Sequence, residues 1–160
     1  MKKLLALLSL IFLAACTSDV VESNYATLAE ARADQLFGRG WLPDVLPASA
    51  FNIRTSNNLD LNQSEGEFSF RPDDSGDLFQ RLHRGPPGTV PYPEYSANIS
   101  VQAGLGYSVW SLQKEQVTWV FFCRASEGRC LYTMWLDRQA PNNSKNGGQV
   151  HSRNQPDPVT

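Results

Sequence analysis

The sequence has few of the residues on which most catalytic and metal sites depend. It contains three cysteines and two histidines in 160 residues, and no serine lies in a G-x-S-x-G motif. The 14 Lys and Arg residues do not outnumber the 16 Asp and Glu residues, so the chain lacks the basic excess that nucleic-acid binding requires. No apolar run reaches the roughly 20 residues that span a bilayer. We therefore expect neither a nucleic-acid-binding protein nor one that crosses a membrane.

The longest apolar run lies near the N-terminus and ends in a cysteine. Two lysines precede Leu4–Leu13, which is too short to span a bilayer and has the length of a signal-peptide core. The run ends in Leu13-Ala14-Ala15-Cys16, which resembles the lipobox of bacterial lipoproteins. The resemblance implies that residues 1–15 are a lipoprotein signal peptide. It also implies that Cys16 carries a diacylglycerol thioether and an amide-linked fatty acid such as palmitate. An ordinary secretory signal is the alternative.

The same resemblance implies a location. Aspartate after the lipidated cysteine retains such lipoproteins in the inner membrane, and this chain has Thr17. We therefore expect a lipid anchor in the inner leaflet of the outer membrane, with the protein facing the periplasm. Residues 16–24 form the lipidated cysteine and a polar linker, whose eight residues after Cys16 reach roughly 27 Å when extended.

The two remaining cysteines predict a disulfide. Cys123 and Cys130 have a C-x6-C spacing, which is typical of neither a redox C-x-x-C motif nor a zinc site. A structural disulfide is favoured in an oxidising compartment. Pairing these cysteines across Ala125–Gly128 predicts a hairpin in which one face is wholly apolar. In this register Phe121 lies opposite Tyr132, Trp119 opposite Met134 and Val117 opposite Leu136. A one-residue slip would destroy that pattern.

The pattern as a whole predicts one α+β domain over residues 25–138, with a disordered tail over residues 139–160. Its fold class is an N-terminal helix packed on a mostly antiparallel sheet, with a C-terminal three-stranded meander. A capping box, Thr27 to Glu30, predicts a helix over 28–37 that Gly38 ends. The remaining expected elements are an apolar connector over 40–47, a hairpin over 51–71, a short helix within 72–82, a loop over 83–95, and a strand over 107–112 with Leu112 opposite Val117 and Trp110 opposite Trp119.

The second face of the meander is half apolar. It carries Val120, Phe122, Leu131 and Trp135 among threonines and arginines. Such a face is either partly covered by a helix or kept for a partner. Phe122 and Trp135 are therefore the candidate binding surface.

One segment resembles a known family. The order YATLAEA, GWLPDVLP, NLDLN and EFSF, within Tyr25–Phe70, is similar to a family of small uncharacterised bacterial proteins. The resemblance implies no activity, but it draws attention to the polar loop that contains Asn58, Asp60 and Asn62. Asp60-x-Asn62-x-Ser64 also resembles the start of a calcium loop. Glu65 stands where that loop needs Gly, and a turn bonded to its own backbone is the simpler interpretation.

Two groups qualify as catalytic candidates. His83 lies in a Pro-rich loop, and Asp73, Asp74 and Asp77 precede the short helix. A surface histidine and a helix N-terminus rich in acidic residues are the commoner explanations. The sequence predicts no cofactor and no metal-ligand set.

Three functions therefore stay open. The leading hypothesis is a non-catalytic accessory or binding lipoprotein of the cell envelope, whose partner is an unidentified envelope protein. The alternatives are an envelope hydrolase that uses His83 or the three aspartates, and a calcium-stabilised binding module at the Asp60 loop.

Overall fold

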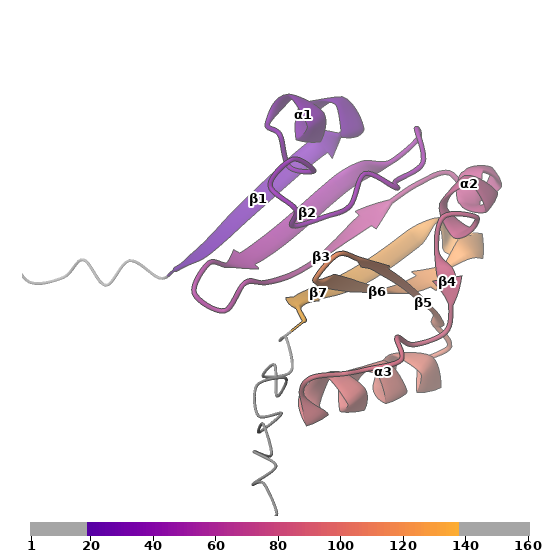
Figure 1. Cartoon of the computed structure of the whole chain (residues 1–160). Coiled ribbons are helices and arrows are strands. Elements are labelled where there is room, and N and C mark those ends of the chain that lie inside the picture. Colours follow the sequence, from indigo (N-terminus) through magenta and orange to yellow (C-terminus); the bar gives the residue numbers. More distant parts are fainter. Residues whose placement is uncertain (1–18, 138–160) are drawn as a thin grey trace, which may run out of the picture.

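The computed structural model describes residues 19–137, which form a seven-stranded antiparallel sheet flanked by short helices (Figure 1). The strand order is β1-β2-β3-β7-β6-β5-β4. The α+β prediction is therefore confirmed.

The predicted signal peptide, Cys16 and the predicted tail over 139–160 lie outside the described residues. Within residues 19–137, no helix is long and apolar enough to cross a membrane. The elements are β1 (Val20–Thr27), α1 (Leu28–Ala33), β2 (Phe51–Asn58), β3 (Gln63–Ser69), η1 (Pro72–Asp74), α2 (Ser75–Phe79), β4 (His83–Arg84), α3 (Pro93–Gly104), β5 (Ser108–Lys114), β6 (Val117–Arg124), η2 (Ala125–Glu127) and β7 (Arg129–Leu136).

The first helix begins where the capping box predicts. The Thr27 hydroxyl accepts a hydrogen bond from the Glu30 amide at 3.2 Å, and the Glu30 carboxylate accepts one from the Ala26 amide at 2.8 Å. The helix ends at Ala33 rather than at residue 37, because the next residues form turns. Gln35 has a φ of 56°, so it takes the left-handed conformation expected at Gly38.

The linker prediction is wrong for residues 20–24. These residues form the first part of β1, which pairs with β2 from Val20 to Thr27. An edge strand needs only backbone hydrogen bonds to one neighbour, so exposed polar side chains do not exclude it. The link between Cys16 and the sheet therefore shortens to Thr17, Ser18 and Asp19.

One sheet face, the core face, carries the main hydrophobic core. It is covered by α1, the connector over 40–47 and α2, and both Leu42 and Leu46 of the connector are buried. The indole nitrogen of Trp119 donates to the backbone carbonyl of Trp41 at 3.2 Å, which fixes the connector to the sheet. Leu78 of α2 is also buried in this core.

The second face, the α3 face, is covered by a helix that the sequence did not predict. We expected a loop over residues 83–95, but α3 begins at Pro93, where proline is compatible with a first helical turn. Ile99 packs on Val120, Phe122 and Trp135, and the Tyr95 ring stacks on Trp135 at 4.7 Å.

The candidate binding surface is therefore wrong as an exposed surface. Phe122 and Trp135 are 2% and 1% exposed, because α3 and the segment before it lie over them. The alternative interpretation, that a helix covers this half-apolar face, is the correct one.

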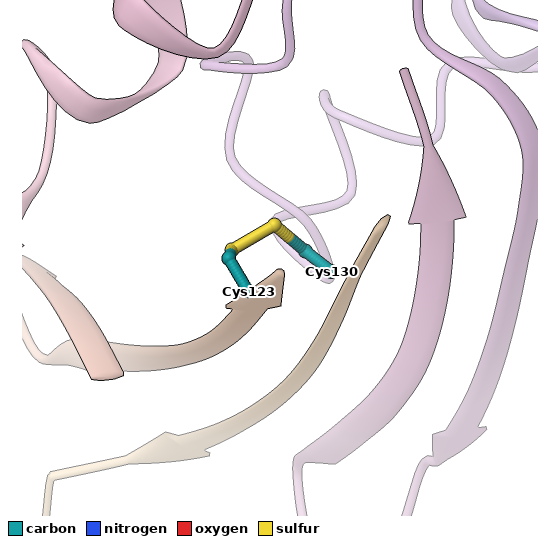
Figure 2. The surroundings of a disulfide bond; sticks show 2 residues. All are labelled: Cys123 and Cys130. Carbon is teal, nitrogen blue, oxygen red and sulfur yellow. A yellow bond between two sulfur atoms is a disulfide. The ribbon is translucent and has the colours of Figure 1, made fainter. Parts of the chain in front are cut away.

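The C-terminal hairpin has the predicted register. Cys123 and Cys130 form a disulfide with their Cα atoms 4.1 Å apart (Figure 2), and Phe121 lies opposite Tyr132. The register of β5 differs by two residues from the prediction. Leu112 lies opposite Trp119, because β5 and β6 are joined by a two-residue turn in which Glu115 has a φ of 56°. A shift of two residues keeps each side chain on the expected face.

Removing the disulfide should destabilise the domain. The Cys123→Ala/Cys130→Ala variant loses a cross-link that closes a short loop, for which chain entropy predicts a loss of about 2.5 kcal/mol in unfolding free energy. Urea unfolding of the variant and of the wild type measures the difference. Reduction of the wild-type protein should produce a similar loss, and equal stability of oxidised and reduced protein would contradict a structural role.

The hairpin also depends on Gly128, which has a φ of 60°. A Cβ atom there would lie 2.0 Å from the Phe70 carbonyl oxygen, so Gly128→Ala should lower the unfolding free energy by about 2 kcal/mol or more. Gly76 of α2 is the matched control, because its Cβ would meet nothing within 4 Å. Gly76→Ala should leave stability unchanged or raise it by about 0.5–1 kcal/mol. Equal effects in thermal or urea unfolding would refute the assignment.

Candidate functional site

The α3 face is covered over only half of its width. Helix α3 lies over β5, β6 and β7, whereas the same face of β1, β2 and β3 presents polar side chains beside it. A cavity of about 520 Å³ lies where the two halves meet, and we call it the α3 groove. It is lined by Glu22, Asn24, Arg54, Thr55, Ser56, Glu65, Gly66, Glu67, Asn98, Gln102, Phe122, Leu131, Tyr132 and Thr133.

Strand register places two glutamates in one row across the groove floor. Glu22 of β1 lies opposite Ser56 of β2, and Ser56 lies opposite Glu65 of β3. Two strand spacings separate the backbones of Glu22 and Glu65, or roughly 10 Å. Among the described residues, neither carboxylate forms an ion pair. The row therefore presents two carboxylates that pair with no basic side chain of residues 19–137.

Glu67, the third carboxylate of the groove, is neutralised. It pairs with Arg54 at 3.2 Å and makes a short contact with Arg129 across the β3–β7 pair. The hydrogen bond that Arg129 donates to the Glu67 carboxylate raises the pKa of Arg129 further above its usual value. Glu67 thus links neighbouring strands of the sheet, while Glu22 and Glu65 have no ion-pair partner among the described residues.

The opposite wall of the groove combines amides with apolar surface. Asn98 and Gln102 project from α3, and the Gln102 amide donates to Asn98 Oδ1 at 3.4 Å. Phe122 and Leu131 form the apolar part of the wall. The lining includes no histidine and no cysteine. Its chemistry suits a cation beside an apolar group.

The polar loop singled out from the sequence forms a turn. Asn58 Oδ1 accepts a hydrogen bond from the Leu61 amide at 3.0 Å, and Asn62 has a φ of 50°. Asp60 shares a hydrogen bond with Asp19, which raises the pKa of Asp60. The bonding of Asn58 matches the turn interpretation. Among residues 19–137, no three His, Cys, Asp or Glu side chains are grouped as metal ligands.

The structure does not bring the catalytic candidates together. His83 is exposed on the two-residue strand β4, and none of its described contacts is with Asp73, Asp74 or Asp77. Asp74 accepts two hydrogen bonds from the Arg71 guanidinium, at 3.1 and 3.0 Å. A hydrogen bond from Ser49 and the contact with Arg71 lower the pKa of Asp74, which is the wrong direction for a general acid near neutral pH.

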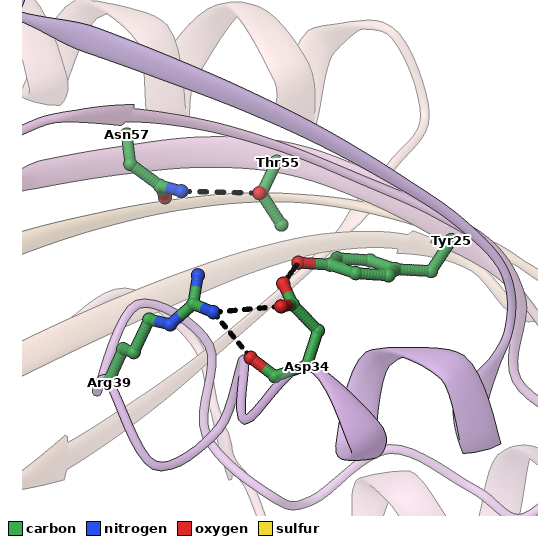
Figure 3. A network of polar contacts seen from close by, with 5 residues as sticks. All are labelled: Tyr25, Asp34, Arg39, Thr55 and Asn57. Atoms are coloured by element: carbon green, nitrogen blue, oxygen red, sulfur yellow. Dashed lines mark hydrogen bonds and ion pairs between the residues drawn. The ribbon is translucent and has the colours of Figure 1, made fainter.

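A second polar cluster lies beneath the core face (Figure 3). The Tyr25 hydroxyl donates to Asp34 at 2.6 Å, and the Asp34 carboxylate pairs with Arg39 at 3.0 Å. Nearby, the Asn57 amide donates to Thr55 at 3.3 Å. No sequence motif marks this cluster, although Thr55 and Asn57 occupy buried positions of β2 that alternate with more exposed ones. Its bonds join the turn after α1 to the sheet, so its role is structural.

The side-chain carbonyl of Asn57 makes a further hydrogen bond within the sheet. It accepts a hydrogen bond from Ser64 at 2.7 Å, and Ser64 lies 3.0 Å from the Tyr132 hydroxyl. Burial raises the pKa of Tyr132, so this phenol stays neutral. The buried polar groups satisfy one another, and the chain of bonds fixes β2, β3 and β7 side by side.

Part of the chain matches a known family model. Residues 19–69, about a third of the sequence, match a family model described as the YbbD head domain. This segment comprises β1, α1, β2 and β3, and it supports the bacterial family segment expected for Tyr25–Phe70. No curated protein and no solved structure matches the chain significantly. The groove residues on β1, β2 and β3 lie within the matched segment, whereas α3, β6 and β7 lie beyond it.

The Asp34 contacts predict a pH dependence. The Tyr25 hydrogen bond and Arg39 lower the pKa of Asp34 below its ordinary value of 3.8. A carboxyl whose pKa is lower in the folded state stabilises the fold above its unfolded pKa, and the contribution disappears as pH falls through the folded pKa. Asp34→Asn should therefore reduce stability at pH 7 and flatten the loss of stability below about pH 4.

Urea unfolding at a series of pH values between 7 and 2.5 measures this effect. Asp77→Asn is the control, because Asp77 is an exposed carboxylate on α2. That variant should follow the wild-type profile. Parallel profiles for Asp34→Asn and the wild type would contradict the role assigned to Asp34.

Proposed function

We propose that this protein is a lipid-anchored, non-catalytic binding module of the bacterial cell envelope. Its anchor is the lipid on Cys16, held in the inner leaflet of the outer membrane, and its binding site is the α3 groove. The observation that carries the proposal is the pair of carboxylates, Glu22 and Glu65, which lack ion pairs within the described residues and lie beside an apolar wall.

The chemistry of the groove favours a basic partner. Glu67 and Arg54 of the lining pair with each other, which leaves Glu22 and Glu65 as the unpaired charges, so a positively charged group gains electrostatic energy on entry. A lysine or arginine side chain reaches the row of Glu22 and Glu65, while a neighbouring apolar side chain packs on Leu131, the half-buried apolar residue of the wall. The amides of Asn98 and Gln102 then hydrogen-bond to the partner backbone. The partner is a segment of an envelope protein that presents a basic residue beside an apolar one.

Two features of the chain support the envelope location. The Leu13-Ala14-Ala15-Cys16 motif follows an apolar run of signal-peptide length. The Cys123–Cys130 disulfide suits an oxidising compartment, where cysteine pairs persist as cross-links. The hydrolase and calcium hypotheses have less support, since no structural observation favours His83, the aspartates or the Asp60 loop as a site.

The proposal predicts that the two carboxylates control partner binding. In intact cells, chemical crosslinking and affinity capture of the lipidated full chain should recover an envelope protein with the wild type. Glu22→Gln/Glu65→Gln should lower that recovery about tenfold, as expected for a loss of about 1.4 kcal/mol. Higher ionic strength should weaken wild-type binding, because salt screens the charge pairs.

The matched control is Glu94→Gln/Glu115→Gln, which removes the same charge from exposed positions outside the groove. It should capture the partner as the wild type does. Equal capture by both double variants would eliminate the groove as the binding site. An unfolding curve for each variant shows whether its fold is intact.

A further inference from the structure

We infer that one end of the sheet rests on the lipid bilayer through an exposed apolar rim. The inference concerns residues outside the α3 groove wall of Phe122 and Leu131, and it rests on the lipid anchor of the proposed function. The rim consists of Val20, Val21, Leu59, Leu61 and Leu136, which are 38%, 43%, 48%, 60% and 42% exposed.

Strand direction gathers these five residues at one end of the sheet. β1 begins at Val20, β2 ends at Asn58, β3 begins at Gln63 and β7 ends at Leu136. In an antiparallel sheet the start of one strand lies beside the end of its neighbour. The pairs Val20–Asn58 and Gln63–Trp135 therefore place all four strand termini at the same end of the sheet. Five of the eight exposed large hydrophobic residues in the described chain are therefore close to one another.

The rim lies next to Asp19, the residue that joins the lipid tether to β1. The Leu59 amide donates to the Asp19 carbonyl oxygen at 2.9 Å, so the β2–β3 turn lies against the residue that precedes β1. Figure 1 shows this turn beside the first residues of β1. Asn58 closes the turn through its bond to the Leu61 amide, which fixes the two leucines on a rigid loop.

The length of the tether identifies the occupant. Four Cα–Cα steps separate Cys16 from Val20, and an extended chain covers roughly 14 Å in four steps. A lipid on Cys16 therefore holds the rim at the level of the headgroups. Apolar side chains at that depth gain free energy by entering the boundary between headgroups and acyl chains.

Charge at the rim favours zwitterionic lipid over anionic lipid. Asp19 and Asp60 lie at the same end of the sheet, because the Leu59 amide donates to the Asp19 carbonyl oxygen and Asp60 follows Leu59. Their carboxyl groups repel anionic headgroups but accept hydrogen bonds from the ammonium group of phosphatidylethanolamine. The bilayer that fits this end of the sheet is therefore rich in phosphatidylethanolamine.

Depth-dependent fluorescence quenching tests the inference on the full lipidated chain. In Leu61→Cys, the new cysteine is the free thiol, because Cys16 is acylated and Cys123 is bonded to Cys130. It is labelled with an environment-sensitive dye and reconstituted in phosphatidylethanolamine vesicles that contain a minor share of phosphatidylglycerol and lipid with a nitroxide near the headgroup. Quenching at position 61 should exceed quenching at a control position several-fold.

The control is Leu105→Cys. Leu105 is 58% exposed, and its carbonyl accepts a hydrogen bond from Arg124, at the opposite end of the strands. A second pair of proteins carries a flexible ten-residue insert between Ser18 and Asp19. If the rim itself binds lipid, the excess quenching at position 61 persists with the insert. If proximity alone causes it, the insert abolishes it.

Each outcome bears on a different part of the argument. Excess quenching at position 61 that survives the insert supports the inference. Equal quenching at positions 61 and 105, or loss of the excess with the insert, overturns bilayer contact and leaves the lipid anchor standing. An unmodified Cys16, seen by mass spectrometry of the purified protein, overturns the anchor and the inference together. Binding of the groove to its partner is measured separately.

Discussion

The pairing of β3 with β7 is the constraint on which the rest of the structure depends. It joins seven residue pairs, from Gln63–Trp135 to Ser69–Arg129, and it connects positions such as Glu67 and Arg129 that are 62 residues apart in the chain. Without it the sheet separates into a three-stranded N-terminal unit and a four-stranded C-terminal unit. Phe68 then loses its edge-to-face contact with Phe121 in the core. Because residues so far apart in the chain must close a large loop, forming this pairing costs conformational entropy. The cooperativity of folding therefore depends on it.

Local constraints explain which parts of the fold the sequence predicts well. Two independent features, the cysteine pair and the alternation of apolar residues, select one register for β6 and β7, and the structure has that register. The capping box likewise predicts the start of α1, because Thr27 and Glu30 bond to backbone groups within one turn. In both cases the side chains that specify the structure are close in the chain.

The incorrect predictions concern segments whose structure depends on contacts with distant parts of the chain. Helix α3 has a single buried residue, Ile99, so its apolar periodicity is too weak to predict a helix in a segment with several prolines. Without that helix, Trp135 was predicted to lie on an exposed binding surface. In the structure Tyr95 and Ile99 of α3 cover this apolar face. Similarly, β1 is an edge strand whose exposed residues resemble a linker.

The candidate site was beyond prediction for a related reason. Glu22, Ser56 and Glu65 come from three strands and form no motif in the sequence. Each occupies an outward position, which an alternating pattern assigns to solvent. Only the presence of α3 beside them turns an open polar surface into a groove. The family resemblance covers most of the unit β1 to β3, which contributes the floor of the groove. It drew attention to the β2–β3 turn and not to the α3 face of these strands.

The position of the groove across the junction links ligand binding to folding. Its floor takes residues from both sides of the β3–β7 pair, so a ligand finds its full set of contacts only when the whole sheet is assembled. A ligand with this selectivity adds RT ln(1 + [L]/Kd) to the unfolding free energy, or about 2.7 kcal/mol at a hundred times its Kd. The melting temperature of the domain therefore measures binding of the partner proposed for the groove. Candidate peptides can be ranked by the degrees they add, before any activity is known.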